Sequence, residues 1–204
     1  MNRREAIQRV AWMMGGAISA PTLMAVLNGC APKETAAGWK PAFLTEEQAT
    51  LAGEVAEIII PRTSTPGAKD VGIAALIDQM LKDVFPKADQ DRYLAGLAEF
   101  ESQAQQQHGR NFLRLERDQQ TALVKSSTEA AMQAQRAYTG PESPPPRPFM
   151  LLTREITLLG YFLSQPGATQ VLQYNPLPGP FRGCVPLAEA GNGKQWAAEE
   201  SRRF

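Results

Sequence analysis

Apolar residues recur at helical spacing along most of this chain, and prolines and glycines divide the pattern into short lengths. The clearest run lies between Ile73 and Pro86, where apolar residues follow one another three or four positions apart. Its members are Ile73, Leu76, Ile77, Met80, Leu81 and Val84. Upstream, Thr45 and Gln48 have the spacing of a capping box, which predicts the start of a helix that Pro61 stops.

Two further helices are predicted between Pro86 and residue 140. The first closes near Gly109, and its apolar face consists of Tyr93, Leu97, Phe100 and Ala104. The second is expected to open at Asp118 and to bury an alanine-rich face made of Ala122, Leu123, Ala130, Ala134 and Tyr138. Asp70 is predicted to cap the helix that contains Ile73.

The last predicted helix, residues 149–163, is apolar on nearly every side and follows a proline-dense break at 140–148. A helix of that kind lies at the centre of a core or is covered by a partner. From Gln165 onward, proline and glycine predict an irregular arm. The expected fold is therefore all-α, a small domain of about five helices with a long irregular C-terminal arm, preceded by a signal helix.

The N-terminal residues have the three parts of an export signal. A basic start with the adjacent pair Arg3 and Arg4 is followed by a mostly apolar run and then by the sequence Leu27-Asn28-Gly29-Cys30. The arginine pair indicates the twin-arginine route, and the ending resembles a bacterial lipobox, which implies cleavage before Cys30 and a lipid on its thiol. Such acylation would hold the exported, periplasmic protein to a membrane without spanning it.

This interpretation divides the chain into a signal peptide at 1–29, a lipid-anchored tether at 30–44 and a helical domain at 45–204. Two alternatives remain open. The apolar run could be a plain transmembrane helix, although glycines and a proline interrupt it. Cys30 could also be an ordinary buried cysteine.

Charge and composition exclude several classes of function. The formal net charge is +0, and no basic stripe indicates nucleic-acid binding. The chain holds 2 cysteines and 1 histidine, too few to build a four-ligand zinc site from these residue types or to ligate an iron–sulfur cluster in the usual way. We expect no metal site and no nucleic-acid partner.

No catalytic constellation is visible either. His108 lies where a helix is predicted to end, without a partner that could position it as a base. Cys184 lies in a Pro/Gly loop with no histidine nearby in sequence, and no serine sits in a nucleophile elbow. We therefore expect no catalytic and no cofactor-binding residue, and a binding or accessory protein.

Two stretches carry a resemblance to a known family. The first runs from Glu57 through Pro61-Arg62-Thr63-Ser64-Thr65-Pro66-Gly67-Ala68-Lys69-Asp70 to Ile77-Asp78. The second comprises Gly160-Tyr161-Phe162, Pro166-Gly167-Ala168, Leu172-Gln173-Tyr174, Pro178-Gly179-Pro180-Phe181 and Gly183-Cys184. In order and spacing they resemble subunit 3, the small subunit of membrane-associated, flavin-dependent gluconate 2-dehydrogenase.

The resemblance implies a partnership rather than an enzyme. It implies a non-catalytic companion of a large FAD-dependent dehydrogenase of the glucose–methanol–choline type, which oxidises a sugar, sugar acid or polyol. FAD would lie in that large subunit, and electrons would pass to haem c in a cytochrome c subunit or domain. The small subunit would carry the folded partner across the membrane with its own signal. The alternative is a stand-alone envelope lipoprotein that binds a ligand or another envelope protein.

Four aromatic residues are candidates for the partner interface: Tyr161, Phe162, Tyr174 and Phe181. They could equally complete the chain's own core. Cys184 would be the only free thiol if Cys30 is acylated. In an oxidising compartment we expect either a disulfide from Cys184 to the large subunit or a protected, buried thiol.

Overall fold

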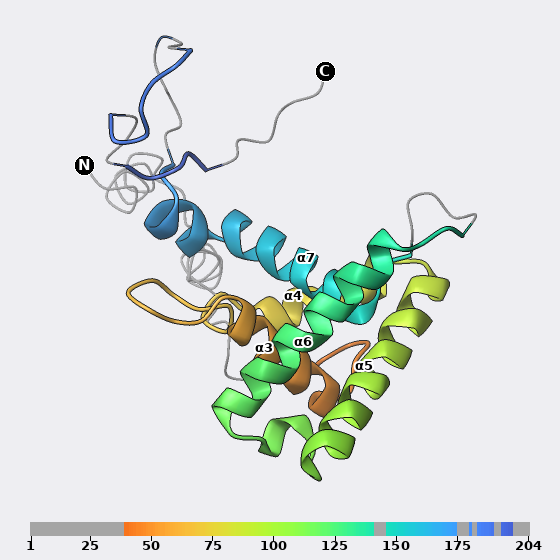
Figure 1. Cartoon of the computed structure of the whole chain (residues 1–204). Coiled ribbons are helices and arrows are strands. Elements are labelled where there is room, and N and C mark those ends of the chain that lie inside the picture. Colours follow the sequence, from red (N-terminus) through yellow and green to blue (C-terminus); the bar gives the residue numbers. More distant parts are fainter. Residues whose placement is uncertain (1–38, 141–145, 175–179, 181–182, 190–192, 198–204) are drawn as a thin grey trace, which may run out of the picture. The chain divides into compact units, whose positions relative to one another are not determined.

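The structure is a computed structural model that describes residues 39–140, 146–174, 180, 183–189 and 193–197. Within these residues the chain is helical and has no β-strand, which confirms the predicted all-α class (Figure 1). The helices are α3 (Glu46–Ile59), α4 (Ile73–Asp83), α5 (Lys87–His108), α6 (Arg117–Arg136) and α7 (Phe149–Leu163), with a 3₁₀ turn η1 (Phe112–Arg114) and a π-helical turn η2 (Gly167–Val171). The signal and lipobox predictions for residues 1–30 lie outside the described residues.

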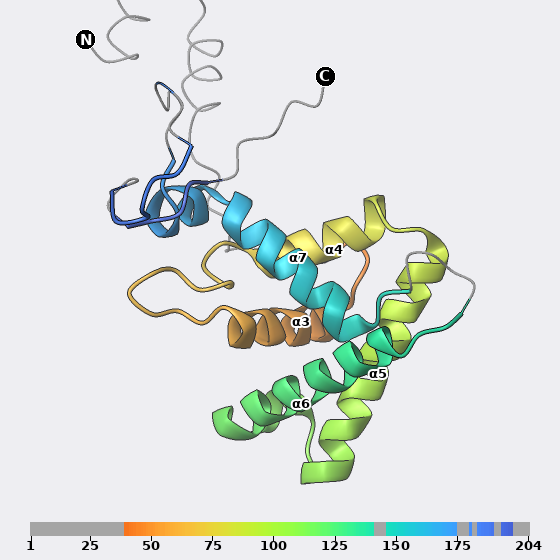
Figure 2. The same ribbon diagram turned by 45° about the horizontal axis from the view of Figure 1, so that its top comes forward.

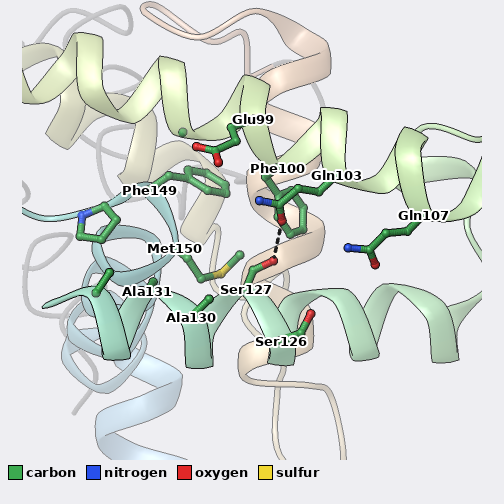
Figure 3. A pocket seen from close by; sticks show the side chains of 13 residues that line it. Glu99, Phe100, Gln103, Gln107, Ser126, Ser127, Ala130, Ala131, Phe149 and Met150 are labelled. Carbon is green, nitrogen blue, oxygen red and sulfur yellow. Dashed lines mark hydrogen bonds between the residues drawn. The ribbon is translucent and has the colours of Figure 1, made fainter. Parts of the chain in front are cut away.

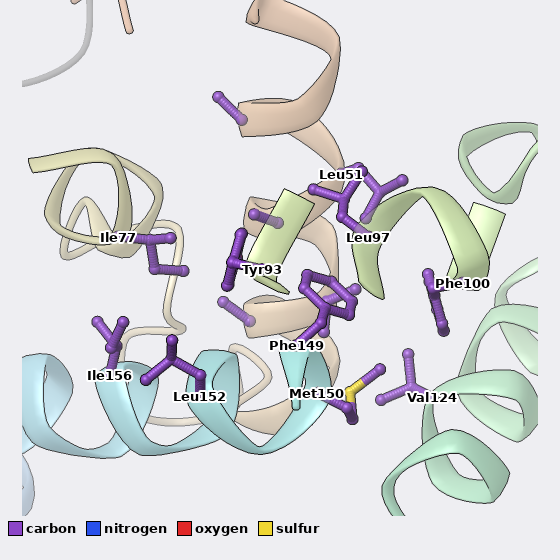
Figure 4. Packing of buried hydrophobic residues seen from close by; sticks show 14 of the residues in the cluster. Leu51, Ile77, Tyr93, Leu97, Phe100, Val124, Phe149, Met150, Leu152 and Ile156 are labelled. Atoms are coloured by element: carbon purple, nitrogen blue, oxygen red, sulfur yellow. The ribbon is translucent and has the colours of Figure 1, made fainter. Parts of the chain in front are cut away.

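The core forms around α7, as the apolar composition of that helix predicts. α7 packs against α3, α4, α5 and α6, and Figure 2 shows it crossing the other helices. In the aromatic centre of the core, Phe149 contacts Tyr93 and Phe100, with ring centroids 5.0 Å and 5.7 Å apart. Other buried side chains of the core come from all five long helices (Figure 4), among them Leu51, Ile77, Leu97, Val124, Leu152 and Ile156.

The helix ends agree with most of the sequence signals. Gln48 N donates to Thr45 Oγ1 at 3.2 Å and Thr45 N donates to Gln48 Oε1 at 3.0 Å, so the predicted capping box is confirmed. α5 ends at Gly109 with a φ of 68°, a left-handed conformation that favours glycine.

Two predicted helix starts were wrong. Asp70 does not cap α4, because that helix begins two residues after Val71 with Gly72 at its cap, and the Asp70 carboxylate instead accepts a hydrogen bond from Gly67 N. α6 opens before Asp118, with Glu116 as its cap, because Glu116 and Gln119 form a capping box of their own.

The predicted alanine-rich face of α6 is also wrong. Leu123 is buried, but Ala122, Ala130 and Ala134 are exposed, and Tyr138 lies beyond the end of the helix. The side chains that α6 buries fully are Gln120, Leu123 and Val124. The larger aliphatic side chains bury more apolar area than alanine does, and they decide which face turns inward.

A buried carboxylate fixes the point where the chain enters the domain. Asp78 of α4 is 2% exposed and accepts hydrogen bonds from three consecutive backbone amides, Ala42 N at 2.7 Å, Phe43 N at 3.0 Å and Leu44 N at 2.7 Å. Hydrogen bonds to a charged acceptor are stronger than neutral ones. Asp78 therefore fastens residues 42–44 to α4 immediately before α3 begins.

Candidate functional site

The C-terminal part of α7 presents apolar side chains outward. Leu159 is 53% exposed, Phe162 37% and Leu163 60%. Their spacing of three and four residues places them on one helix face, which we name the α7 stripe. The opposite face at the same height is buried, with Ile156, Thr157 and Tyr161. Contiguous apolar surface of this kind marks interaction sites in soluble domains.

Tyr161 does not belong to this exposed surface. It is 2% exposed, its hydroxyl donates to Pro66 O at 2.6 Å, and its ring meets the ring of Phe162 edge-on at a centroid distance of 5.3 Å. Of the four aromatic candidates, Tyr161 therefore lies in this chain's own core, whereas Phe162 and Tyr174 are exposed, Tyr174 at 57%. Phe181 lies outside the described residues.

The C-terminal arm leaves the helical domain and returns to the same point. Gln173 N donates to Gln195 O and Ala197 N donates to Gln173 O, both at 2.8 Å, which makes an isolated parallel bridge between Gln173 and Trp196. Lys194 Nζ also donates to Gln170 O at 2.7 Å. Long loops whose ends are held together are often functional. Proline and glycine content predicted an irregular arm. It could not predict the bridge between Gln173 and Trp196, or that Trp196 is exposed there.

Cys184 lies on that arm and is exposed as a free thiol. The structure therefore does not place it among the packing residues of this chain. A partner could reach its sulfur without any rearrangement of the helical core.

A groove lies between α5 and α6 (Figure 3). The groove has a volume of about 620 Å³, with Phe100, Phe149 and Met150 at its apolar base. Ser127 Oγ donates to Gln103 Oε1 across it at 3.3 Å. Among the described residues that line it, Glu99 is the only ionisable one.

No group of three or more His, Cys, Asp or Glu side chains within the described residues could hold a metal ion, and His108 sits partly exposed at the end of α5. Desolvation raises the pKa of Glu101, which accepts a hydrogen bond from Phe112 N at 3.1 Å while its other oxygen is buried without a partner. Among the described helices, none has both the length and the apolar character needed to span a bilayer.

Comparison with known proteins gives one family. The model of the family described as gluconate 2-dehydrogenase subunit 3 matches residues 46–179. No curated protein and no solved structure matches the chain. The matched region contains all the described helices, the α7 stripe and Tyr174, and it ends before Cys184. Because the match spans well over half of the 204 residues, the chain belongs to the gluconate 2-dehydrogenase subunit 3 family.

Proposed function

We propose that this chain is a non-catalytic small subunit that binds, stabilises and exports a large FAD-dependent dehydrogenase of the glucose–methanol–choline type. The partner would oxidise a sugar, sugar acid or polyol and pass electrons to haem c in a cytochrome c subunit or domain. The observation that carries the proposal is an exposed apolar stripe on α7 in a member of a family named as a subunit. Exposed apolar side chains gain free energy when a second protein covers them.

The arrangement of the helices supports placing FAD in the partner. Dinucleotide cofactors of this kind are commonly bound at βαβ units, where the phosphates meet a glycine-rich turn. The described residues contain no strand and therefore no such unit. The oxidation would then take place in the large subunit, and this chain would supply binding contacts and the export signal.

Co-purification from the native host tests the proposal. Affinity-tagged full chain should bring down a large flavin-containing chain in equimolar amount, and deletion of its gene should abolish envelope dehydrogenase activity while the message for the large subunit persists. Purified chain that oxidises a sugar with a dye acceptor, free of any second protein, would overturn the non-catalytic assignment.

Export is the second part of the proposal and depends on residues 1–30. Replacing Arg3 and Arg4 with Lys keeps the positive charge but removes the guanidinium pair, so the precursor should stay in the cytoplasm. Cys30→Ser should remove the lipid and shift the protein from the detergent phase to the aqueous phase. Normal export of the first variant, or unchanged partitioning of the second, would count against the corresponding assignment.

The groove between α5 and α6 favours a second candidate, a stand-alone envelope lipoprotein that binds a small ligand. Its volume of about 620 Å³ falls in the range of ligand sites. The co-purification experiment separates the two, because the stand-alone protein would be isolated without a flavin-containing chain.

A further inference from the structure

The two longest described helices, α5 and α6, face each other across the groove (Figure 3), but each packs mainly on other elements. α5 packs on α7 and η1, whereas α6 packs on α7 and α3. The side chains that α6 buries, Gln120, Leu123 and Val124, all lie before residue 125. From Lys125 to Arg136, a length of about three turns, no side chain of α6 is buried. The second half of α6 is therefore a helix that the core of this chain does not cover.

The groove runs along both helices. Its lining residues recur at helical spacing on α5 from Gly96 to Gln107 and on α6 from Ser126 to Ala134. At 1.5 Å of rise per residue, the two walls are about 16 Å and about 12 Å long, which is three turns and two turns of a helix. Figure 3 shows the labelled side chains of the two walls in order along the helices. The shape fits an elongated segment of chain.

The floor of the groove is apolar, and its α6 wall is built from small side chains. Phe100, Phe149 and Met150 form the floor, and each is 4% exposed or less. The α6 wall consists of Ser126, Ser127, Ala130, Ala131 and Ala134. At Gly96 a Cβ would lie 2.6 Å from Phe149 Cβ, so glycine lets the start of α7 approach α5 and form the floor. Small side chains allow the axes of packed helices to come close together, so a third helix can approach the floor.

Glu99 stands at the edge of the groove without a counter-ion. Its side chain is exposed and has no ion pair or hydrogen bond with any described residue. Arg147, which precedes the lining residue Pro148, already pairs with Glu155, and Lys125 does not line the groove. A cationic side chain on the occupant would complement this carboxylate. Because Glu99 lies toward one end of the groove, the pair would also set the direction in which the occupant lies.

We propose that the groove receives one amphipathic helix of the large flavoprotein subunit, with its apolar face on the floor and a lysine or arginine opposite Glu99. Insertion of an amphipathic helix into a groove is a recurring mode of protein recognition. The inference rests on the proposed function, since it names a second surface through which that partnership forms. This surface is separate from the α7 stripe, because nine residues of α7, about 13 Å of helix, lie between Met150 and Leu159.

Binding of the purified, FAD-containing large subunit to the immobilised full chain tests the groove. Ala130→Trp places an indole ring on the α6 wall and should raise the dissociation constant at least ~10-fold, as expected for a blocked interface. Ala122→Trp makes the same change at an exposed alanine of α6 that does not line the groove, and should change the constant less than about twofold. Thermal unfolding checks that both variants are folded.

A second pair of variants tests the charge. Glu99→Gln keeps the size of the side chain and should raise the dissociation constant about 3-fold at low salt, with the difference fading toward ~0.5 M salt because ions screen the attraction. Glu129→Gln, at an exposed carboxylate of α6 that does not line the groove, is the control and should show no such trend. Equal binding of Glu99→Gln and the wild-type chain at every salt concentration would contradict a cation opposite Glu99.

Hydrogen exchange of the complex reports what covers the groove. Amides of residues 125–136 should exchange more slowly in the complex than in the free chain, because a covered helix opens less often. In the large subunit, one stretch of about 8–12 residues should gain protection with them, the length of a helix of two to three turns. Both gains should be lost when Ala130→Trp replaces the wild-type chain. Unchanged exchange at 125–136 would overturn the proposal.

The outcomes separate this inference from the proposed function. If the wild-type chain binds no flavoprotein, the function fails and the inference fails with it. If the wild-type chain binds and Ala130→Trp binds equally well, the groove is wrong while the function stands. Two other occupants would also overturn the proposal. A dimer of the chain alone that Ala130→Trp dissociates would assign the groove to a second copy, and a small molecule that co-purifies with the wild-type chain but not with this variant would assign it to a ligand.

Discussion

The segment of α7 from Phe149 to Thr157 and its final turn from Leu159 to Leu163 are similar in composition but opposite in surroundings. In the first, Phe149, Met150, Leu152 and Ile156 are each 4% exposed or less, whereas in the second both leucines are more than half exposed. Near the final turn, α4 approaches the inner side so closely that a Cβ at Gly160 would meet the Ile73 and Leu76 side chains. The outer side has no such neighbour among the described residues. Similar apolar sequence is therefore buried in the core where neighbouring helices surround it and stays exposed where they do not.

The largest expected difference in the free energy of unfolding comes from replacing one leucine by alanine in each of the two segments of α7. Leu152→Ala should lower the free energy of unfolding by about 2–5 kcal/mol, because it leaves a cavity in the core. Leu159→Ala, the matched change on the stripe, should lower it by less than about 0.5 kcal/mol. Urea unfolding of both variants measures the difference. Equal losses would mean that the final turn is buried in solution, and would remove the distinction between the two segments.

The next largest loss of stability is expected at Asp78, a buried residue of α4. Asp78→Asn retains the size of the side chain but turns an amide group toward a backbone N–H, so at least one of the three amides at residues 42–44 loses its acceptor. We expect a loss of about 1–3 kcal/mol and new chymotrypsin cleavage after Phe43. Asp83→Asn, on the exposed side of the same helix, is the control and should change neither. Resistance of the Asp78 variant to cleavage would show that other contacts hold the segment.

Periodicity predicted the class of the fold and the bounds of α7 to the residue, because a helix that is apolar on nearly all sides leaves few alternatives. It could not separate the core of α7 from its exposed stripe, since exposure depends on helices far away in sequence. Asp78 was part of the sequence stretch that resembles the family, but its role depends on backbone amides that only the folded chain brings near. Tyr161 was a candidate both for a partner interface and for the chain's own core, because the sequence does not show which helices cover each face of α7; the structure places it in the core.

A third prediction concerns Cys184 on the exposed arm. If the chain is exported with a large subunit as proposed, we expect Cys184 to form a disulfide with that subunit, because an accessible thiol in an oxidising compartment finds a partner more readily than a buried one. Thiol-blocked, non-reducing gels of the native complex should show one band at the summed mass that splits on reduction. Cys184→Ser should abolish that band yet leave the noncovalent complex intact, if the α7 stripe supplies the main contacts. Two bands in the wild-type complex before reduction would exclude the crosslink.

The smallest effect concerns Glu101, which ties α5 to η1 on the buried side. Desolvation raises its pKa in the folded state, so the folded chain binds this proton more tightly than the unfolded chain. The carboxyl group therefore destabilises the fold at pH values above its folded pKa, and this penalty disappears as the pH falls below its unfolded value.

Glu101→Gln keeps an acceptor for Phe112 N and removes the charge, so it should stabilise the chain at neutral pH by less than about 1 kcal/mol, with the gain fading in acid. Paired urea titrations of the wild-type chain and the variant near pH 7 and near pH 4 measure it. A gain that is the same at both pH values would mean that packing, rather than the cost of a buried charge, sets the contribution of Glu101.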